Sequence, residues 1–196
     1  PPPLLSGLFK GWDGSSAYDA AQLPTAIYAA LRTDSAFTLV EMDGELCAIV
    51  AKLRAVLPHN APLRDDFSLL KCIKENYEDQ VKCGYNAVTA VMSNVAFAKH
   101  KIPYTQLDGG VVPTLKHKFF ETDLPFGLCT FKDIACMIGV DCPTIDKMIR
   151  CNQALIGKEY LTETGKIDGA DAGECVLPSR FGLTKETLEY GNRDRT

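Results

Sequence analysis

Residues 116–128 read KHKFFETDLPFGL, and an apolar run from Leu128 to Ile138 follows them directly. The stretch places two lysines, a histidine and two carboxylates just before a Pro-Phe-Gly break. The start of a helix leaves backbone N–H groups free, and these groups favour nearby negative charge. The stretch therefore predicts a loop that leads into a helix, and it marks this junction as a candidate site.

Helical spacing of apolar residues extends from this junction in both directions. The spacing and the capping residues predict helices at about 24–33, from Asp34 or Ser35 to 57, from Asp65 or Asp66 to 77, at 86–100, at 128–138 with Gly139 as the C-cap, at 145–155 with Thr144 as the cap and Pro143 just outside, and at 185–190. Residues 1–24 are rich in Gly, Ser and Pro and predict irregular structure. No window alternates over the length of a strand. The predicted fold class is therefore all-α, a bundle of about six helices in a single domain, 1–196.

Composition narrows the class of protein. The chain has 196 residues, a net charge of −4 and no recurring basic run, which argues against general binding to nucleic acid. No apolar stretch reaches the roughly 18 residues of a membrane span. We therefore expect a protein without nucleic-acid or membrane partners.

Eight cysteines occur without a C-x-x-C pair, and most of them fall within helix-like apolar patterns. This setting favours reduced core thiols in a cytoplasmic protein over a secreted disulfide framework. The three histidines show no ligand spacing with the cysteines, so we expect no metal site.

Several cofactor motifs are absent from the sequence. There is no G-x-G-x-x-G after a strand, no G-x-x-x-x-G-K-[ST], no G-x-S-x-G and no H-E-x-x-H. The chain alone is therefore not expected to be a nucleotide-binding enzyme or a hydrolase of these kinds.

The residues of the junction allow two interpretations. Lys118 and Asp123 can form a substrate clamp, in which the lysine binds an anion and the aspartate orients a histidine. Alternatively, Asp123 is a helix cap and Lys118 is an exposed side chain. Trp12 is likewise either a pocket wall or a core anchor. Of the histidines, His117 is expected at the surface and His100 at a helix C-terminus, and His59 lies in a polar loop.

Five segments resemble, in order, the helical C-terminal domain of the octopine/nopaline (opine) dehydrogenases. Residues 8–14, LFKGWDG, resemble the opening "F-K-D-W-D-G" of that domain, and residues 118–128 resemble its "R-Y-L-x-E-D-V-P-F-G-L". Residues 138–146, 155–160 and 180–183 resemble "G-V-x-T-P-x-I-D", "L-G-K-E-Y" and "R-F-G-L/I".

The resemblance implies an NAD(P)H-dependent reductive condensation of an amino acid with a 2-oxo acid such as pyruvate. It implies that an N-terminal Rossmann domain, absent from this chain, binds NAD(H) or NADP(H). The helical domain, similar to the C-terminal domain of 6-phosphogluconate dehydrogenase, would carry the amino-acid site. Asp123 matches the proton-handling aspartate of the family, and Lys118 matches an arginine that holds a carboxylate. Thr122 and Trp12 are the further expected substrate-binding residues.

Two departures from the family pattern affect this expectation. Lysine at position 118 keeps the charge of arginine but loses its bidentate fork. The family's histidine lies close to where Pro1 stands, so it is either replaced by proline or left upstream, as the triple-proline start also suggests. We therefore expect the chain alone to lack opine dehydrogenase turnover. The alternative is a non-catalytic helical module for binding or assembly.

Overall fold

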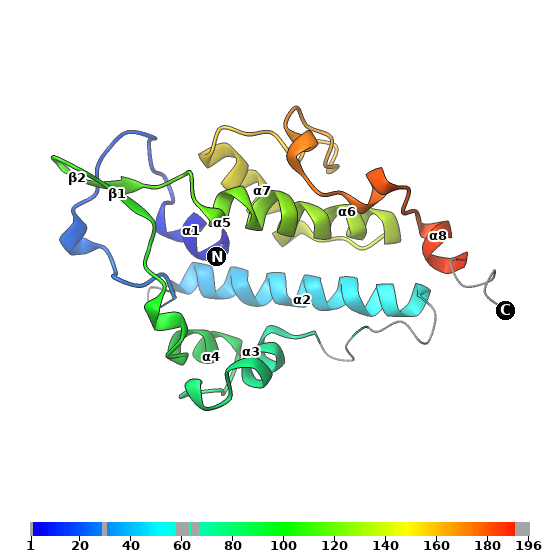
Figure 1. Ribbon diagram of the computed structural model, residues 1–196, viewed down its shortest axis with the longest axis horizontal. Coiled ribbons are helices and arrows are strands. Elements are labelled where there is room, and N and C mark those ends of the chain that lie inside the picture. The colour runs from blue at the N-terminus through cyan, green and yellow to red at the C-terminus, as the bar shows by residue number, and fades with distance from the viewer. Residues whose placement is uncertain (1, 29–30, 58–62, 64–66, 191–196) are drawn as a thin grey trace.

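One long helix organises the molecule (Figure 1). The computed structural model describes residues 2–28, 31–57, 63 and 67–190. Helix α2, Thr33–Val56, contacts α6, Cys129–Ile138, and α7, Pro143–Leu155. On its other side lie α3, Leu69–Tyr77, and α4, Ala87–Ser93. The short α8, Lys185–Tyr190, lies near the C-terminal end of α2. The predicted helical fold class is confirmed.

The helices with strong local signals lie close to their predicted positions. Helix α6 ends at Gly139, which adopts a left-handed conformation with φ of 70° and closes the helix as a C-cap. Helix α2 runs through Gly44 without interruption, and its N-cap position is Arg32, which makes no side-chain cap. Neither Asp34 nor Ser35 is the N-cap, because both lie inside the first turn. The predicted caps Asp65 and Asp66 and the loop residue His59 lie outside the described residues.

The irregular structure predicted for residues 1–24 was wrong for the first part of this segment. Residues Pro2–Leu8 form helix α1, which packs against α2 and α7. Prolines are tolerated in the first turn of a helix, and the burial of Leu4 and Leu5 holds the segment in place. The expected helix at 24–33 is not formed by its described residues. Instead, Ile27 donates a backbone hydrogen bond of 3.0 Å to the carbonyl of His100, next to a β-bridge between Ala26 and Lys101.

The predicted helix at 86–100 is shorter than expected. Asn86 caps α4 and forms a capping box with Thr89, but the helix ends at Ser93. Asn94 follows in an extended conformation, and its side chain accepts a hydrogen bond from the backbone of Ala96. A 3₁₀ turn at Phe97–Lys99 completes this segment.

A two-stranded antiparallel hairpin was not predicted. Strand β1, Tyr104–Leu107, pairs with β2, Gly110–Pro113, across the two-residue turn Asp108-Gly109. An isolated bridge between Tyr18 and Val111 attaches the hairpin to the N-terminal segment. Four residues per strand are too few to give a recognisable alternation.

The start of α7 is capped from a distant part of the chain. The carboxylate of Glu45, in α2, accepts the backbone N–H groups of Thr144 at 2.7 Å and Ile145 at 2.8 Å. Pro143 is the first residue of the helix and Cys142 is its N-cap residue, so Thr144 is not the cap. Charge on α2 therefore stabilises the positive end of α7.

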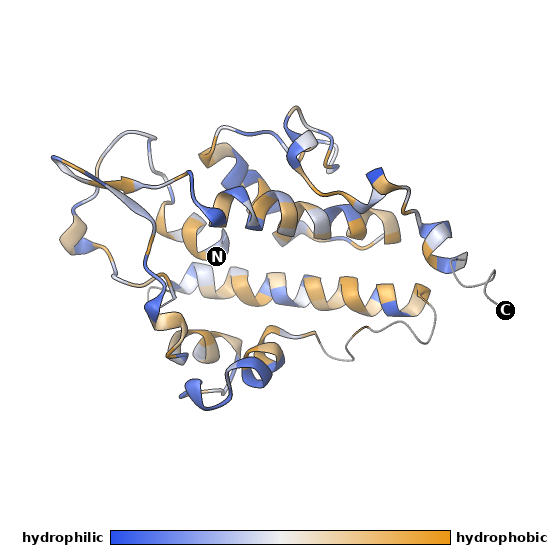
Figure 2. Cartoon of the chain, viewed as in Figure 1, coloured by the Kyte–Doolittle hydropathy of each residue, from blue (hydrophilic) through white to orange (hydrophobic). Residues whose placement is uncertain are grey.

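Hydrophobic residues recur along the helices of the bundle (Figure 2), and their side chains form buried clusters. The largest cluster joins α2, α6, α7 and the C-terminal segment, with Ile49, Ile145 and Tyr160 at its centre. A second group, here called the N-terminal cluster, consists of Leu4, Leu5, Phe9, Ile27, Ile102, Phe119 and Phe120. The N-terminal cluster fixes the two phenylalanines of the 116–128 stretch.

None of the eight cysteines, all of which lie in the described part of the chain, forms a disulfide. Cys129, Cys142 and Cys175 are buried, as expected for core thiols. The expectation of core thiols was wrong for Cys83, Cys136 and Cys151, which are exposed. Among the described helices, none combines the length and the apolar character that crossing a membrane requires.

Replacing Gly110 by alanine is expected to destabilise the hairpin. A Cβ at this position would overlap the backbone carbonyl of Tyr18, and φ of 139° is strained for an L-residue. We expect a loss of about 1–3 kcal/mol in the free energy of unfolding, measured by chemical denaturation. Gly109→Ala is the matched control, because a Cβ there meets nothing within 4 Å. Equal stability of the two variants would contradict the close approach of Gly110 to Tyr18.

Candidate functional site

The 116–128 stretch forms a short helix followed by a wider turn. His117 caps α5, Lys118–Glu121, because its Nδ1 accepts the backbone N–H of Phe119 at 3.4 Å. A π-helical turn, η4, covers Asp123–Leu128 and leads into α6. Pro125 has no N–H to donate inside this turn, which suits a local departure from α-helical bonding. The predicted loop-to-helix junction is therefore a continuous helical bend.

The bend has two different faces. Phe120, Glu121 and Pro125 contribute to the wall of a cavity. Lys118, Thr122 and Asp123 line none of the described cavities. The side-chain hydroxyl of Thr122 donates to the carbonyl of Lys118, and it lies 3.4 Å from Oδ1 of Asp123. The three predicted site residues of this stretch are thus neighbours, and they lie apart from the cavity face.

The electrostatic effects of Lys118 and Asp123 converge on His117. Burial lowers the pKa of His117, the charge of Lys118 lowers it further, and the carboxylates of Asp123 and Glu121 oppose this shift. Burial, together with the charge of Asp123, raises the pKa of Tyr28 to about 12. Lys118 is exposed and its Nζ lies 5.6 Å from the centroid of the Phe119 ring. Both charged groups therefore act on the same imidazole, although no direct ion pair between them is found in the described part of the chain.

Trp12 packs against the N-terminal cluster and is half-buried. Its Nε1 donates a hydrogen bond of 2.8 Å to the carbonyl of Ser16. The neighbouring Asp13 accepts from the side chain and backbone of Ser16 and from Ser15, and these bonds lower the pKa of its carboxyl group. Trp12 lines none of the described cavities, so its substrate-binding role stays a prediction.

Two of the segments with family-like sequences meet at a cavity of about 560 Å³. The 115–126 segment forms one wall, and Ile156, Lys158 and Tyr160 form the other together with Glu174. Lys158 pairs with Asp171 at 2.9 Å and with Glu174, and the Tyr160 hydroxyl donates to Glu174 at 2.9 Å. These residues were not predicted from the sequence, although the family-like segment at 155–160 was a signal for them.

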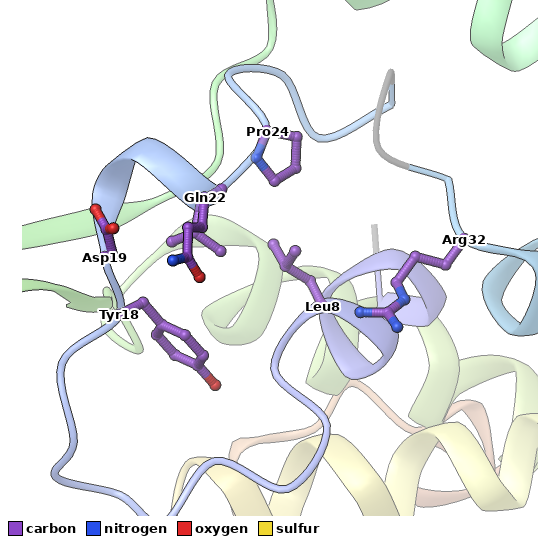
Figure 3. A pocket seen from close by; sticks show the side chains of 7 residues that line it. Leu8, Tyr18, Asp19, Gln22, Pro24 and Arg32 are labelled. Carbon is purple, nitrogen blue, oxygen red and sulfur yellow. The ribbon is translucent and has the colours of Figure 1, made fainter.

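A second cavity, of about 410 Å³, lies between α1, the segment 18–24 and the start of α2 (Figure 3). A third, of about 340 Å³, is mostly apolar and includes Leu4, Tyr28 and Phe97. Neither cavity was predicted from the sequence. Over the described residues, no group of three or more His, Cys, Asp or Glu side chains is arranged to hold a metal ion.

The fold and this helical bend define the class of protein. The structure superposes on octopine dehydrogenase with NADH and L-arginine with a TM-score of 0.83, at 26% identity, over 100% of this chain and 47% of that chain. The structure of octopine dehydrogenase with NADH and agmatine gives 0.82, also at 26% identity and with the same coverage. The chain thus has the fold of the helical domain of a dehydrogenase.

A family model described as "NAD/NADP octopine/nopaline dehydrogenase, alpha-helical domain" matches residues 16–156. The chain belongs to this family. Octopine dehydrogenase of Pecten maximus is 28% identical over 182 residues, which cover 93% of this chain and 44% of the relative. Tauropine dehydrogenase of Arabella iricolor is 30% identical over 183 residues, or 93% of this chain and 45% of the relative. The chain therefore spans less than half the length of these relatives.

Proposed function

We propose that this chain is the substrate-binding helical half of an opine-type dehydrogenase. Together with a nucleotide-binding half, it would catalyse the NAD(P)H-dependent reductive condensation of an amino acid with a 2-oxo acid such as pyruvate. The observation that supports this most strongly is the helical bend at 118–128. Within a domain of the octopine/nopaline dehydrogenase family, it places Lys118, Thr122 and Asp123 next to one another, and the charges of Lys118 and Asp123 act in opposite directions on the pKa of His117.

Each residue of the bend has a proposed role. Lys118 binds the carboxylate of a substrate, and its exposed position leaves the ammonium group accessible. Asp123 is half-buried at the start of the π-helical turn, and it holds the substrate amino group or a proton. Thr122 fixes the backbone between them through its bond to Lys118. Trp12 contributes an aromatic surface.

The described residues offer no phosphate-binding loop, so the nucleotide would lie mainly on the other half of the enzyme. NAD(H) or NADP(H), when bound there, supplies the hydride. Eight cysteines without a disulfide are suited to a reducing compartment, and we place the protein in the cytoplasm.

Turnover by the full-length protein tests this proposal. NADH or NADPH oxidation is followed with pyruvate and a panel of amino acids, including arginine, alanine, glycine and taurine. We expect oxidation that requires both the amino acid and the 2-oxo acid, and none with the 1–196 chain alone. Oxidation of the nucleotide by the isolated chain, or none by the full-length protein with any pair of substrates, would refute the proposed division of work.

A non-catalytic binding or assembly module is the second candidate. The lysine at position 118, in place of the arginine of the family pattern, favours it. A full-length protein that binds an amino acid in calorimetry but does not oxidise NADH would support this alternative.

Restoring the guanidinium at position 118 is expected to strengthen substrate binding. Arginine offers two parallel N–H donors to a carboxylate, whereas lysine offers a point charge. We expect Lys118→Arg to lower the KM for the 2-oxo acid by about 10-fold and Lys118→Met to raise it by at least as much, since a tenfold change corresponds to about 1.4 kcal/mol. Steady-state kinetics of the full-length protein measure both. An unchanged KM in both variants would remove Lys118 from the site.

A further inference from the structure

The cavity of Figure 3 collects polar side chains that the proposed function does not use. Tyr18, Gln22 and Arg32 line it, together with the apolar Leu8 and Pro24. The guanidinium of Arg32 extends towards the other side chains, and the Gln22 amide and the Tyr18 ring point into the same space (Figure 3). Lys118, Asp123, Thr122 and Trp12 do not line this cavity.

The hairpin holds one wall of this cavity in place. The backbone N–H and carbonyl of Tyr18 bond to Val111 at 2.8 and 2.9 Å. The hydroxyl of Tyr104 donates to the carbonyl of Pro24 at 3.2 Å. The segment that carries Tyr18 and Gln22 is thus attached at both ends to other parts of the chain. The backbone that carries Tyr18 and Gln22 is therefore held in place beside the cavity, while the Gln22 and Arg32 side chains are exposed and accessible to a ligand.

The polar groups in the cavity are mainly hydrogen-bond donors. Arg32 has five N–H donors in a fixed fork, Gln22 has an amide NH₂ and Tyr18 has a hydroxyl. Among the described residues, none of these three side chains has a hydrogen-bond or ion-pair partner. Asp19 is the acidic residue of the lining, and its Oδ1 accepts the backbone N–H of Ala21 at 2.9 Å. An anion that enters the cavity would therefore find free donors.

The N-terminus of α2 adds to this preference. Arg32 is the N-cap residue of this 24-residue helix and makes no side-chain cap. The positive end of the helix dipole and the guanidinium therefore lie together beside the cavity.

We propose that this cavity binds the carboxylate of a small organic monoanion, with the Arg32 fork as its main partner and the Gln22 amide and Tyr18 hydroxyl as further donors. A monoanion matches the single cation of the lining. A dianion such as phosphate would meet stronger repulsion from Asp19, the acidic residue of the lining. Leu8, Leu23 and Pro24 provide an apolar surface for the alkyl part of the ligand. This site is separate from the Lys118–Asp123 site and does not depend on its function.

Titration of the ¹⁵N-labelled chain with sodium acetate, followed by NMR, tests the site at constant ionic strength. We expect saturable shifts of the Gln22 side-chain NH₂ and the Arg32 Nε–H signals. Arg32→Gln should weaken acetate binding by about 10-fold or more, as expected for the loss of a charge-assisted bidentate contact. Lys147→Gln, on the exposed surface of α7, removes one positive charge elsewhere and should leave binding unchanged.

Two further measurements make the outcome decisive. Gln22→Ala, an exposed position, should reduce acetate binding by a few-fold without altering the backbone spectrum elsewhere. Inorganic phosphate at the same ionic strength should bind more weakly than acetate. The proposal is wrong if the shifts rise linearly with acetate, if they persist in Arg32→Gln, or if phosphate binds more tightly. None of these outcomes depends on dehydrogenase activity, so the two proposals can fail separately.

Discussion

Replacing Lys132 by methionine is expected to lower the free energy of unfolding by about 3–5 kcal/mol. Lys132 lies in α6 and is only 7% exposed. Its Nζ pairs with Asp146, in α7, at 2.7 Å to Oδ1 and 2.9 Å to Oδ2. Methionine has a similar length but no charge, so the aspartate would remain partly buried without its partner.

The surroundings of this ion pair explain the size of the effect. The Cys142 thiol lies 3.7 Å from the lysine Nζ, and burial raises its pKa to about 11, so the thiol stays neutral at pH 7. Burial alone would lower the pKa of Lys132, but the hydrogen bond to Asp146 offsets this, and the net pKa is raised. The ammonium form is therefore the stable form in the folded chain, and Asp146 is the partner that maintains it.

Chemical denaturation of three variants measures this effect. Lys147→Met, at an exposed position of α7, is the control and should change stability by about 0.5 kcal/mol or less. The double variant Lys132→Met, Asp146→Leu should be more stable than Lys132→Met alone, because it leaves no unpaired buried charge. If Lys132→Met and Lys147→Met were equally stable, the pair would not contribute to the fold.

Replacing Asp123 by asparagine in the full-length protein is expected to reduce kcat by about 10²–10⁴-fold, the usual contribution of a proton-transferring group. Asparagine keeps the size of the side chain and can still accept a hydrogen bond at the start of the turn, so the fold should persist. The loss of charge should also lower the pKa of Tyr28 from about 12, because the charge of Asp123 contributes to that value. NADH oxidation measures the first effect, and titration of the tyrosine absorbance measures the second.

Glu121→Gln is the matched control for this experiment. Glu121 lies two residues before Asp123 and loses the same charge, but it faces the other side of the bend. We expect its kcat to stay within about 3-fold of the wild type, since it lies outside the proposed proton path. If Asp123→Asn retained full turnover with a normal Tyr28 titration, Asp123 would act only as a helix-start residue.

The sequence predicted the elements whose signals are local. Helix α6 has a regular apolar pattern and a glycine at its end, and α7 follows a proline that marks its start. The hairpin was not predicted because its strands have only four residues each, and because Tyr18, which bridges to Val111, is distant in the sequence. Helix α1 was missed for the same reason, since burial of Leu4 and Leu5 against other helices outweighs the turn-forming residues around them.

The candidate site was predictable only in part. Lys118, Thr122 and Asp123 are close in the sequence, so their proximity in space follows directly from one helical bend. The cavity that Lys158 and Glu174 share with the 115–126 segment was not predictable, because it forms only where the chain after α7 folds back against that segment. The cavity at Arg32 was not predictable either, because one of its walls is held by the bonds between Tyr18 and Val111 of the hairpin, and the hairpin has no clear pattern in the sequence.

The carboxylate of Glu45 at the start of α7 makes two distant parts of the chain dependent on each other. A fragment that begins after Val56 would still contain every residue of α7, yet its first turn would have two unbonded amide groups in the apolar interior. Such a fragment should show frayed amides at Thr144 and Ile145 in hydrogen exchange. Adding the isolated Thr33–Val56 peptide in trans should slow the exchange of these two amides, whereas the same peptide with Glu45→Gln should protect them less.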